Sequence, residues 1–205
     1  MKLSGILCTV ALSLVAFAGS ASAATVISLD RQDSPGDAGW ETIVMTATSD
    51  AGNIIGFNFD SGGGSGLGFA GPLLQVDPFG QKAIFNDVPG AIFGAAGSDI
   101  LNDTHFLVPS AQGIAINAAE SADSLAGAFN FSNAGAQGPS LAFAQLVGVK
   151  GNTVSYAGDF TVATPTGNVL ERVTGEFTFG IPEPATFVLA GMGALGLVAA
   201  RRRMA

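Results

Sequence analysis

The sequence predicts an all-β protein, an antiparallel β-sandwich of the jelly-roll type. Between residues 24 and 180 the apolar stretches are short, many alternate with polar residues, and Gly, Pro, Asn or Asp separates them. Glycine, with 29 of 205 residues, is about twice as frequent as in an average domain. Closely spaced short strands with glycine-rich turns are typical of sandwiches and barrels.

The pattern gives an expected set of strands in chain order. They cover residues 26–29, 42–48, 54–59, 73–76, 83–85, 105–108, 113–117, 126–131, 141–149, 153–162 and 169–179. Alternation is clearest in Gly175-Glu176-Phe177-Thr178-Phe179, and the last two segments are expected to pair as a long hairpin. Residues 62–71 are expected to form a flexible glycine loop.

Phenylalanine is the main aromatic residue, with fifteen copies against one Trp and one Tyr. Strand positions favour a core role for most of them, including Phe57, Phe59, Phe129, Phe131 and Phe143. The segments Ile54-Ile55-Gly56-Phe57-Asn58-Phe59 and Leu141-Ala142-Phe143-Ala144-Gln145-Leu146-Val147 resemble strands of cohesin-like sandwich domains. That resemblance makes a cohesin-like sandwich the alternative to a jelly roll.

The N-terminal region is predicted to be a secretory signal peptide, residues 1–23, with a helical apolar segment. Lys2 precedes a mostly apolar run over residues 3–18, and Ala21-Ser22-Ala23 supplies the small residues that signal peptidase accepts. Cleavage is expected after Ala23, with Ala21 and Ala23 as the recognised positions. The alternative is an uncleaved membrane anchor.

The C-terminal region, residues 181–205, has three features in a fixed order. Pro182-Glu183-Pro184 is followed by sixteen uncharged, mostly apolar residues, 185–200, and then by Arg201-Arg202-Arg203. As a helix the sixteen residues would span roughly 24 Å, enough to cross a thinned bilayer as a transmembrane helix. The positive-inside rule keeps the arginines cytoplasmic as a membrane stop, so residues 24–180 face outward as one ectodomain.

This order of features resembles the PEP-CTERM sorting domain of exported bacterial proteins. The resemblance implies recognition by an exosortase, a membrane enzyme thought to act as a cysteine-dependent transpeptidase near the tripeptide. It also implies export to the cell envelope, the outer surface or an extracellular biofilm matrix, with transient anchoring in the inner membrane. An ordinary tail anchor, which would keep the protein in the membrane, is the alternative.

The charge of residues 24–180 argues against a nucleic-acid partner. Fifteen carboxylates face only four basic residues, Arg31, Lys82, Lys150 and Arg172, for a formal charge of −11. Binding phosphates requires clustered Lys and Arg. The one cysteine, Cys8, lies in the predicted signal peptide, so no disulfide is expected in the mature protein.

No catalytic constellation is predicted. His105 is the only histidine, there is no G-x-S-x-G elbow, and a surface or strand-edge position is expected for His105. Gly66-Leu67-Gly68-Phe69-Ala70-Gly71 matches G-x-G-x-x-G, but Pro72 follows and no helical pattern comes after it. We therefore expect no enzyme and no nucleotide site.

Carboxylates leave a few alternatives open. Glu41 beside Trp40 is the best candidate for a sugar site, against a Trp40 at a sheet edge with Glu41 in solvent. Two loop clusters are candidates for calcium: Asp30, Asp33 and Asp37, and Asp99, Asn102 and Asp103. Neither has EF-hand spacing, so no metal or other cofactor is assigned.

The sequence as a whole favours a structural matrix or cell-surface protein. Its expected partners are signal peptidase, the exosortase, the membrane and extracellular polysaccharide. A carbohydrate-binding or calcium-dependent adhesion module is the first alternative, and a carbohydrate-active enzyme using Glu41, Glu120, Glu171 or Glu176 is the second.

Overall fold

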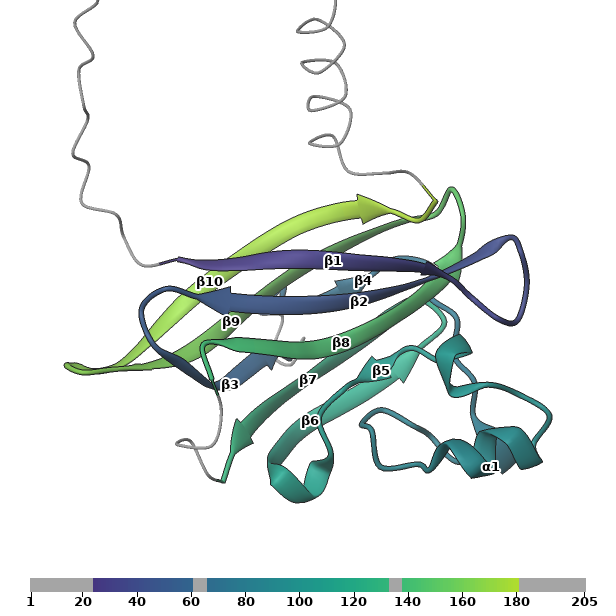
Figure 1. The fold of residues 1–205 in the computed structure, drawn as a ribbon, viewed down its shortest axis with the longest axis horizontal. Helices are drawn as coiled ribbons and strands as arrows, with labels where there is room; N and C mark the ends of the chain where they lie inside the picture. Colours follow the sequence, from purple (N-terminus) through teal and green to yellow (C-terminus); the bar gives the residue numbers. More distant parts are fainter. Residues whose placement is uncertain (1–23, 61–65, 133–137, 181–205) are drawn as a thin grey trace, which may run out of the picture.

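The computed structural model describes residues 24–60, 66–132 and 138–180, which form an all-β protein with antiparallel sheets (Figure 1). The prediction of the all-β class is thereby confirmed. The strands are β1 (Thr25–Asp33), β2 (Trp40–Ser49), β3 (Asn53–Phe59), β4 (Gly68–Ala70), β5 (His105–Phe106), β6 (Gly113–Ser121), β7 (Ser124–Phe131), β8 (Ser140–Val149), β9 (Thr153–Thr164) and β10 (Gly167–Thr178).

The strands form two sheets. The first has the order β1-β2-β8-β5, and the second has the order β10-β9-β3-β7, with β6 on the outer side of β7. The chain changes sheet at several connections, among them those from β2 to β3 and from β8 to β9. Because β2 pairs with β8 and β3 pairs with β9, these two crossings connect the sheets side by side. The predicted final hairpin is confirmed, since β9 and β10 pair along their whole length.

Strands β3 and β4 occupy one position in the second sheet. Both lie between β9 and β7, and β4 continues the line of β3 along the same two neighbours. The two strands therefore share one strand position of the second sheet. The predicted glycine loop over residues 62–71 is wrong at Gly68–Ala70, which pairs on both sides as a strand, and residues 62–65 lie outside the described residues.

The core lies between the inner faces of the two sheets. The predicted core residues Phe57, Phe59, Phe129, Phe131 and Phe143 are each at most 8% exposed, which confirms their role. Phe143 of β8 stacks on Phe59 of β3, with ring centroids 5.2 Å apart, so the contact crosses from sheet to sheet. Burying one such ring contributes about 1.5–3 kcal/mol.

Two predicted strands are wrong, and a third is shorter than predicted. In the segment 73–76 the amide of Leu73 donates to Ala122 in the β6–β7 turn of the second sheet, and that of Leu74 donates to Val147 in β8 of the first. A segment bridging two sheets cannot build a ladder with either. In the segment 83–85 only Phe85 forms a bridge, to Phe106, and the segment 105–108 is reduced to β5.

A short helix, α1 (Gly90–Ala95), was not predicted. It contains two glycines and has no side-chain cap, so its sequence gives little helical propensity. Phe93, fully buried, fixes it to the body of the protein. Tertiary packing therefore forms this helix against local preference.

Within the described residues no helix is long and apolar enough to cross a membrane. The predicted signal helix, residues 1–23, and the predicted transmembrane helix in 181–205 lie outside the described residues.

Candidate functional site

One lateral side of the protein is closed by a seam between β1 and β10, the edge strands of the two sheets (Figure 1). Polar contacts mark both ends of the seam. At one end the hydroxyls of Thr25 and Ser49 donate to the carboxylate of Glu171. At the other end Arg31 donates to the carbonyl of Thr178 over 3.2 Å. The described chain ends at this second end, at Gly180.

Four groups at this second end form a network that we call the exit clamp: the side chains of Arg31 and Glu41 and the backbone of Thr178 and Gly180. Glu41 Oε2 lies 2.8 Å from Arg31 Nη1 and also accepts the amide of Gly180 over 2.7 Å. Arg31 completes the network through Thr178. The clamp thus joins β1 and β2 of one sheet to the end of β10 in the other.

Strand alternation places Glu41 in the clamp. Glu41 shares the inner face of β2 with Ile43, Met45 and Ala47, all fully buried, and it is itself only 7% exposed. A buried carboxylate is costly unless it is paired and hydrogen-bonded. Arg31 and the Gly180 amide supply that pairing.

The residue before Gly180 is anchored separately. Phe179 is fully buried. Its ring lies over Gly148 and meets the ring of Phe177 edge to face, with the ring centroids 5.3 Å apart. Its backbone exchanges hydrogen bonds with the β8–β9 turn, donating to Asn152 and accepting from Gly151.

Gly180 then adopts a φ of +75°, and a Cβ there would lie 2.8 Å from Lys150 Cβ and Cγ. The turn out of the core requires glycine.

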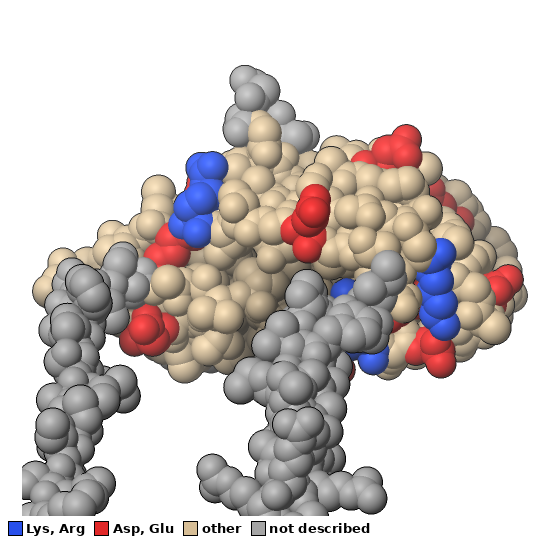
Figure 2. Space-filling view, turned by 90° about the horizontal axis from the view of Figure 1, so that it is seen from above, with Lys and Arg blue, Asp and Glu red and all other residues tan. Residues whose placement is uncertain are grey.

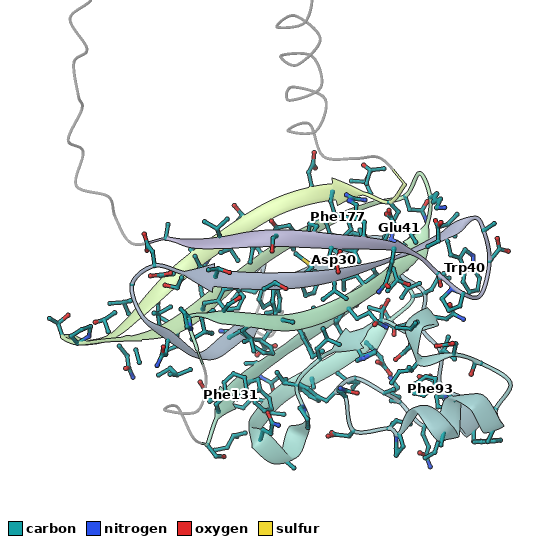
Figure 3. All side chains as sticks on the ribbon, in the orientation of Figure 1. Asp30, Trp40, Glu41, Phe93, Phe131 and Phe177 are labelled. Carbon is teal, nitrogen blue, oxygen red and sulfur yellow. The ribbon has the colours of Figure 1, made fainter. Side chains whose placement is uncertain are left out.

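The predicted sugar site at Trp40 and Glu41 is not formed. Successive residues of a strand point to opposite faces, so Glu41 turns inward to Arg31 while Trp40 packs near Gly36 and the β1–β2 loop (Figure 3). The alternative, a Glu41 in solvent, is also wrong, because its partners bury it. The side chain that was a sugar-site candidate is a member of the exit clamp.

His105 and Asp103 form a buried pair. His105 Nδ1 lies 3.1 Å from Asp103 Oδ2, and the two residues are 2% and 1% exposed. Burial raises the pKa of Asp103, against the lowering effect of its hydrogen bonds with His105 and the Val76 amide. A surface or strand-edge position is expected for His105. It lies on the edge strand β5, which agrees with that expectation, but it is buried rather than exposed. The pair lies where a substrate has no direct access.

A second buried glutamate, Glu120 on β6, lies in acidic surroundings. Neither of its side-chain oxygens has a hydrogen-bond donor within the described part of the chain. Burial, followed by the charges of Asp77 and Asp103, raises its pKa to about 7, while Lys82 opposes the shift. When protonated, Glu120 can donate to Asp77. Glu120 is therefore the group of this region that binds a proton near neutral pH.

Most side chains of the two candidate calcium clusters have other partners. In the first cluster Asp33 pairs with Lys150 at 2.7 Å, and Asp37 accepts a hydrogen bond from the amide of Gly39.

In the second cluster Asp99 caps the turn at Leu101, and Asn102 accepts hydrogen bonds from Ser34 and the Gly36 amide. Within residues 24–60, 66–132 and 138–180 no group of three or more His, Cys, Asp or Glu is arranged to hold a metal.

A groove of about 310 Å³ lies on β4, β7 and β9, next to Gly66 and Leu67. Its lining combines small residues with two larger apolar ones and one tyrosine: Gly66, Leu67, Gly68, Phe69, Ala70, Ser124, Ala126, Ser155, Tyr156 and Ala157. None of these is charged. The G-x-G-x-x-G residues thus lie in a strand and its approach, without the following helix that a pyrophosphate site requires.

Basic residues are scattered over the described surface (Figure 2). Three of the four are held by carboxylates: Arg31 by Glu41, Lys150 by Asp33, and Arg172 by Asp159. A stripe of cations that could follow a phosphate backbone is not present among the described residues.

Comparison with known proteins identifies one element. A family model described as the PEP-CTERM protein-sorting motif matches residues 180–203, so the predicted recognition of this motif is confirmed. No curated protein and no solved structure gave a significant match. The match covers Pro182, Glu183 and Pro184 and ends at Arg203, which lie outside the described residues, and it begins at Gly180, the last residue of the exit clamp.

Sequence reasoning missed most of the clamp. Arg31, Thr178 and Gly180 were not singled out, because their contacts span up to 147 positions of sequence. One signal was present, since Glu41 continues the inward series of Ile43, Met45 and Ala47. A charged residue on the buried face of a strand indicates that a partner comes from elsewhere in the fold.

Proposed function

We propose that this chain, which carries the PEP-CTERM sorting motif at residues 180–203, is an exported structural protein of the cell surface or extracellular matrix. The motif implies an exported, envelope-associated protein that an exosortase recognises. In the proposed pathway Pro182-Glu183-Pro184 is the recognition element, the apolar segment anchors the precursor in the inner membrane, and Arg201 to Arg203 act as the stop. The single observation that carries this proposal is the motif match at the end of a folded domain.

The proposed start of the mature protein is Ala24, after cleavage of a signal peptide over residues 1–23. Strand β1 begins one residue later, and the Ala24 nitrogen lies 3.3 Å from Asp50 Oδ1. A new α-ammonium group at Ala24 would have this carboxylate as its counter-charge. The position is consistent with cleavage at the boundary between the signal and the fold.

For residues 24–180 we propose a structural role without catalysis or a resident cofactor, in a sandwich of jelly-roll or cohesin-like type. The buried Asp103–His105 pair, the inward Glu41 and the uncharged groove support this reading of the domain. The proposed location is a biofilm matrix, in which the protein associates with extracellular polysaccharide. Retention of the purified protein on host polysaccharide, with loss on Trp40→Ala, would favour a carbohydrate-binding module instead.

The sorting proposal is tested by replacing the tripeptide in the native host. A variant with Pro182→Ala, Glu183→Ala and Pro184→Ala should accumulate in the membrane fraction, while the wild-type protein leaves it. Glu176→Ala, an exposed carboxylate change on β10, serves as the control and should be sorted like the wild type. Equal release of the tripeptide variant and the wild type would reject exosortase sorting.

A further inference from the structure

The folded domain ends very close to the sorting motif. Gly180 is held by Glu41, and the sequence places only Ile181 between it and Pro182. Two residues of fully extended chain reach at most about 7 Å. The tripeptide therefore begins within about 7 Å of an atom fixed to the folded domain.

Holding Gly180 goes beyond what the end of β10 requires. Phe179 already anchors the end of β10 through its buried ring and its two backbone hydrogen bonds. The clamp acts one position later, on a glycine that follows the last core residue. It uses a buried carboxylate and a partly buried guanidinium for this purpose. Such a device orders the chain up to Gly180, two positions before the tripeptide.

We propose that the exit clamp is a positioning device for sorting: Arg31 and Glu41 hold Gly180 so that the tripeptide reaches the exosortase at one fixed place, with the clamp end of the domain against the enzyme. This inference rests on the proposed function. Arg31 and Glu41 are positioning residues, since they touch the chain before the motif and not the reacting bond.

The surface around the exit is also fixed. Lys150, packed against Gly180, donates to Asp33 and to the carbonyl of Ala38. These contacts join the β8–β9 turn to the β1–β2 loop beside the point where the chain leaves. The short spacer obliges an enzyme acting at the tripeptide to accommodate this end of the domain.

Ordering the substrate before it binds should favour processing. A free residue loses backbone entropy when an enzyme fixes it, and a pre-ordered residue has already lost it on folding. Releasing one residue next to the motif should lower the processing rate by about tenfold. A loose exit should also allow the enzyme to cut at more than one position.

The test is carried out on the full chain in the native host. The rate of processing is followed by pulse labelling, and the C-terminus is identified by intact mass. One variant carries Gly-Ser-Gly-Ser between Gly180 and Ile181, which leaves the clamp and the tripeptide intact but lengthens the spacer by up to about 14 Å. The matched control carries the same four residues between Pro165 and Thr166, in the exposed β9–β10 turn at the opposite end of the hairpin.

Two substitutions address the clamp itself. Glu41→Ala removes both contacts, whereas Glu41→Gln keeps an oxygen that can accept the Gly180 amide. Glu41→Ala and the spacer insertion should be processed about tenfold more slowly or at mixed positions, and Glu41→Gln should restore most of the loss. Thermal unfolding of each variant separates this effect from instability, because the spacer insertion should leave the midpoint unchanged.

The outcomes separate the two proposals. If the wild type is trimmed near the tripeptide and the spacer variant is trimmed at the same rate and position, the positioning role is refuted while sorting stands. If the wild type keeps its C-terminal segment, sorting itself is refuted, and the positioning role with it.

Discussion

Glu41 and Glu120 are buried to almost the same degree, 7% and 9% exposed, but their surroundings are opposite. Glu41 has a guanidinium and a backbone amide as partners. Glu120 has no donor within the described residues, and burial, followed by the charges of Asp77 and Asp103, raises its pKa to about 7. Burial alone therefore does not define what a carboxylate does in this fold. Through its partners Glu41 connects the two sheets, whereas Glu120 binds a proton near neutral pH.

The largest effect is expected when Glu41 is made to resemble Glu120. Arg31→Met removes the guanidinium and leaves a buried carboxylate with the Gly180 amide alone. We expect a loss of about 3 kcal/mol in the free energy of unfolding, measured by urea denaturation at pH 7. Adding Glu41→Gln to Arg31→Met should recover part of the loss. A loss below about 0.5 kcal/mol would mean that Arg31 is not the partner that makes burial of Glu41 tolerable.

The second prediction removes the charge at Glu120. In the folded state the pKa is about 7 against an ordinary value of 4.5, so the fold binds this proton more tightly than the unfolded chain does. Stability from this group is present below about pH 4.5 and is lost as pH rises to about 7 and beyond. Glu120→Gln should therefore stabilise the protein by about 2 kcal/mol at pH 8 and have little effect at pH 4.5.

The measurement is a pair of urea denaturation series from pH 4.5 to pH 8, for the wild type and Glu120→Gln. Asp123→Asn, in the exposed β6–β7 turn, is the matched control and should follow the wild type. Parallel pH profiles for the wild type and Glu120→Gln would contradict the raised pKa.

A smaller effect is expected at the glycine that Glu41 holds. Gly180→Ala puts a Cβ on a residue with positive φ and against Lys150, so the local turn is strained. We expect a loss of about 1 kcal/mol, since the residue lies after the core. Gly151→Ala has a similar positive φ but open space around its Cβ, and comparing the two urea midpoints separates the steric part from the backbone part.

The smallest effect is expected at an ion pair whose arginine is exposed to solvent. Arg172 and Asp159 pair across β9 and β10, and the arginine is exposed. Asp159→Asn should change the free energy of unfolding by at most about 0.5 kcal/mol. A loss as large as that of Arg31→Met would show that burial does not distinguish the two pairs.

The sequence predicts the strands where alternation and local turns decide the pairing. The β9–β10 hairpin is such a case, because its two strands follow each other directly. The segment 73–76 is the opposite case, because its apolar residues resemble a strand while the amides of Leu73 and Leu74 donate to the β6–β7 turn and to β8. Helix α1 was missed since Phe93 packing, and not propensity, forms it.

The candidate site was predictable only in its local part. The tripeptide and the arginines are contiguous in the sequence and were found there, as the motif match confirms for the segment. The exit clamp depends on contacts between Glu41 and a residue 139 positions away, which no local pattern contains. The inward position of Glu41 indicated that a partner exists, but not which one.

The central claim is that the folded domain is delivered and trimmed through its C-terminal motif, and intact-mass analysis of the wild-type protein tests it most directly. The protein is recovered from its native host and separated into membrane and extracellular fractions. The account predicts a mature form that starts near Ala24 and ends near Pro182-Glu183-Pro184. A form in the membrane fraction that still ends at Ala205 would contradict it.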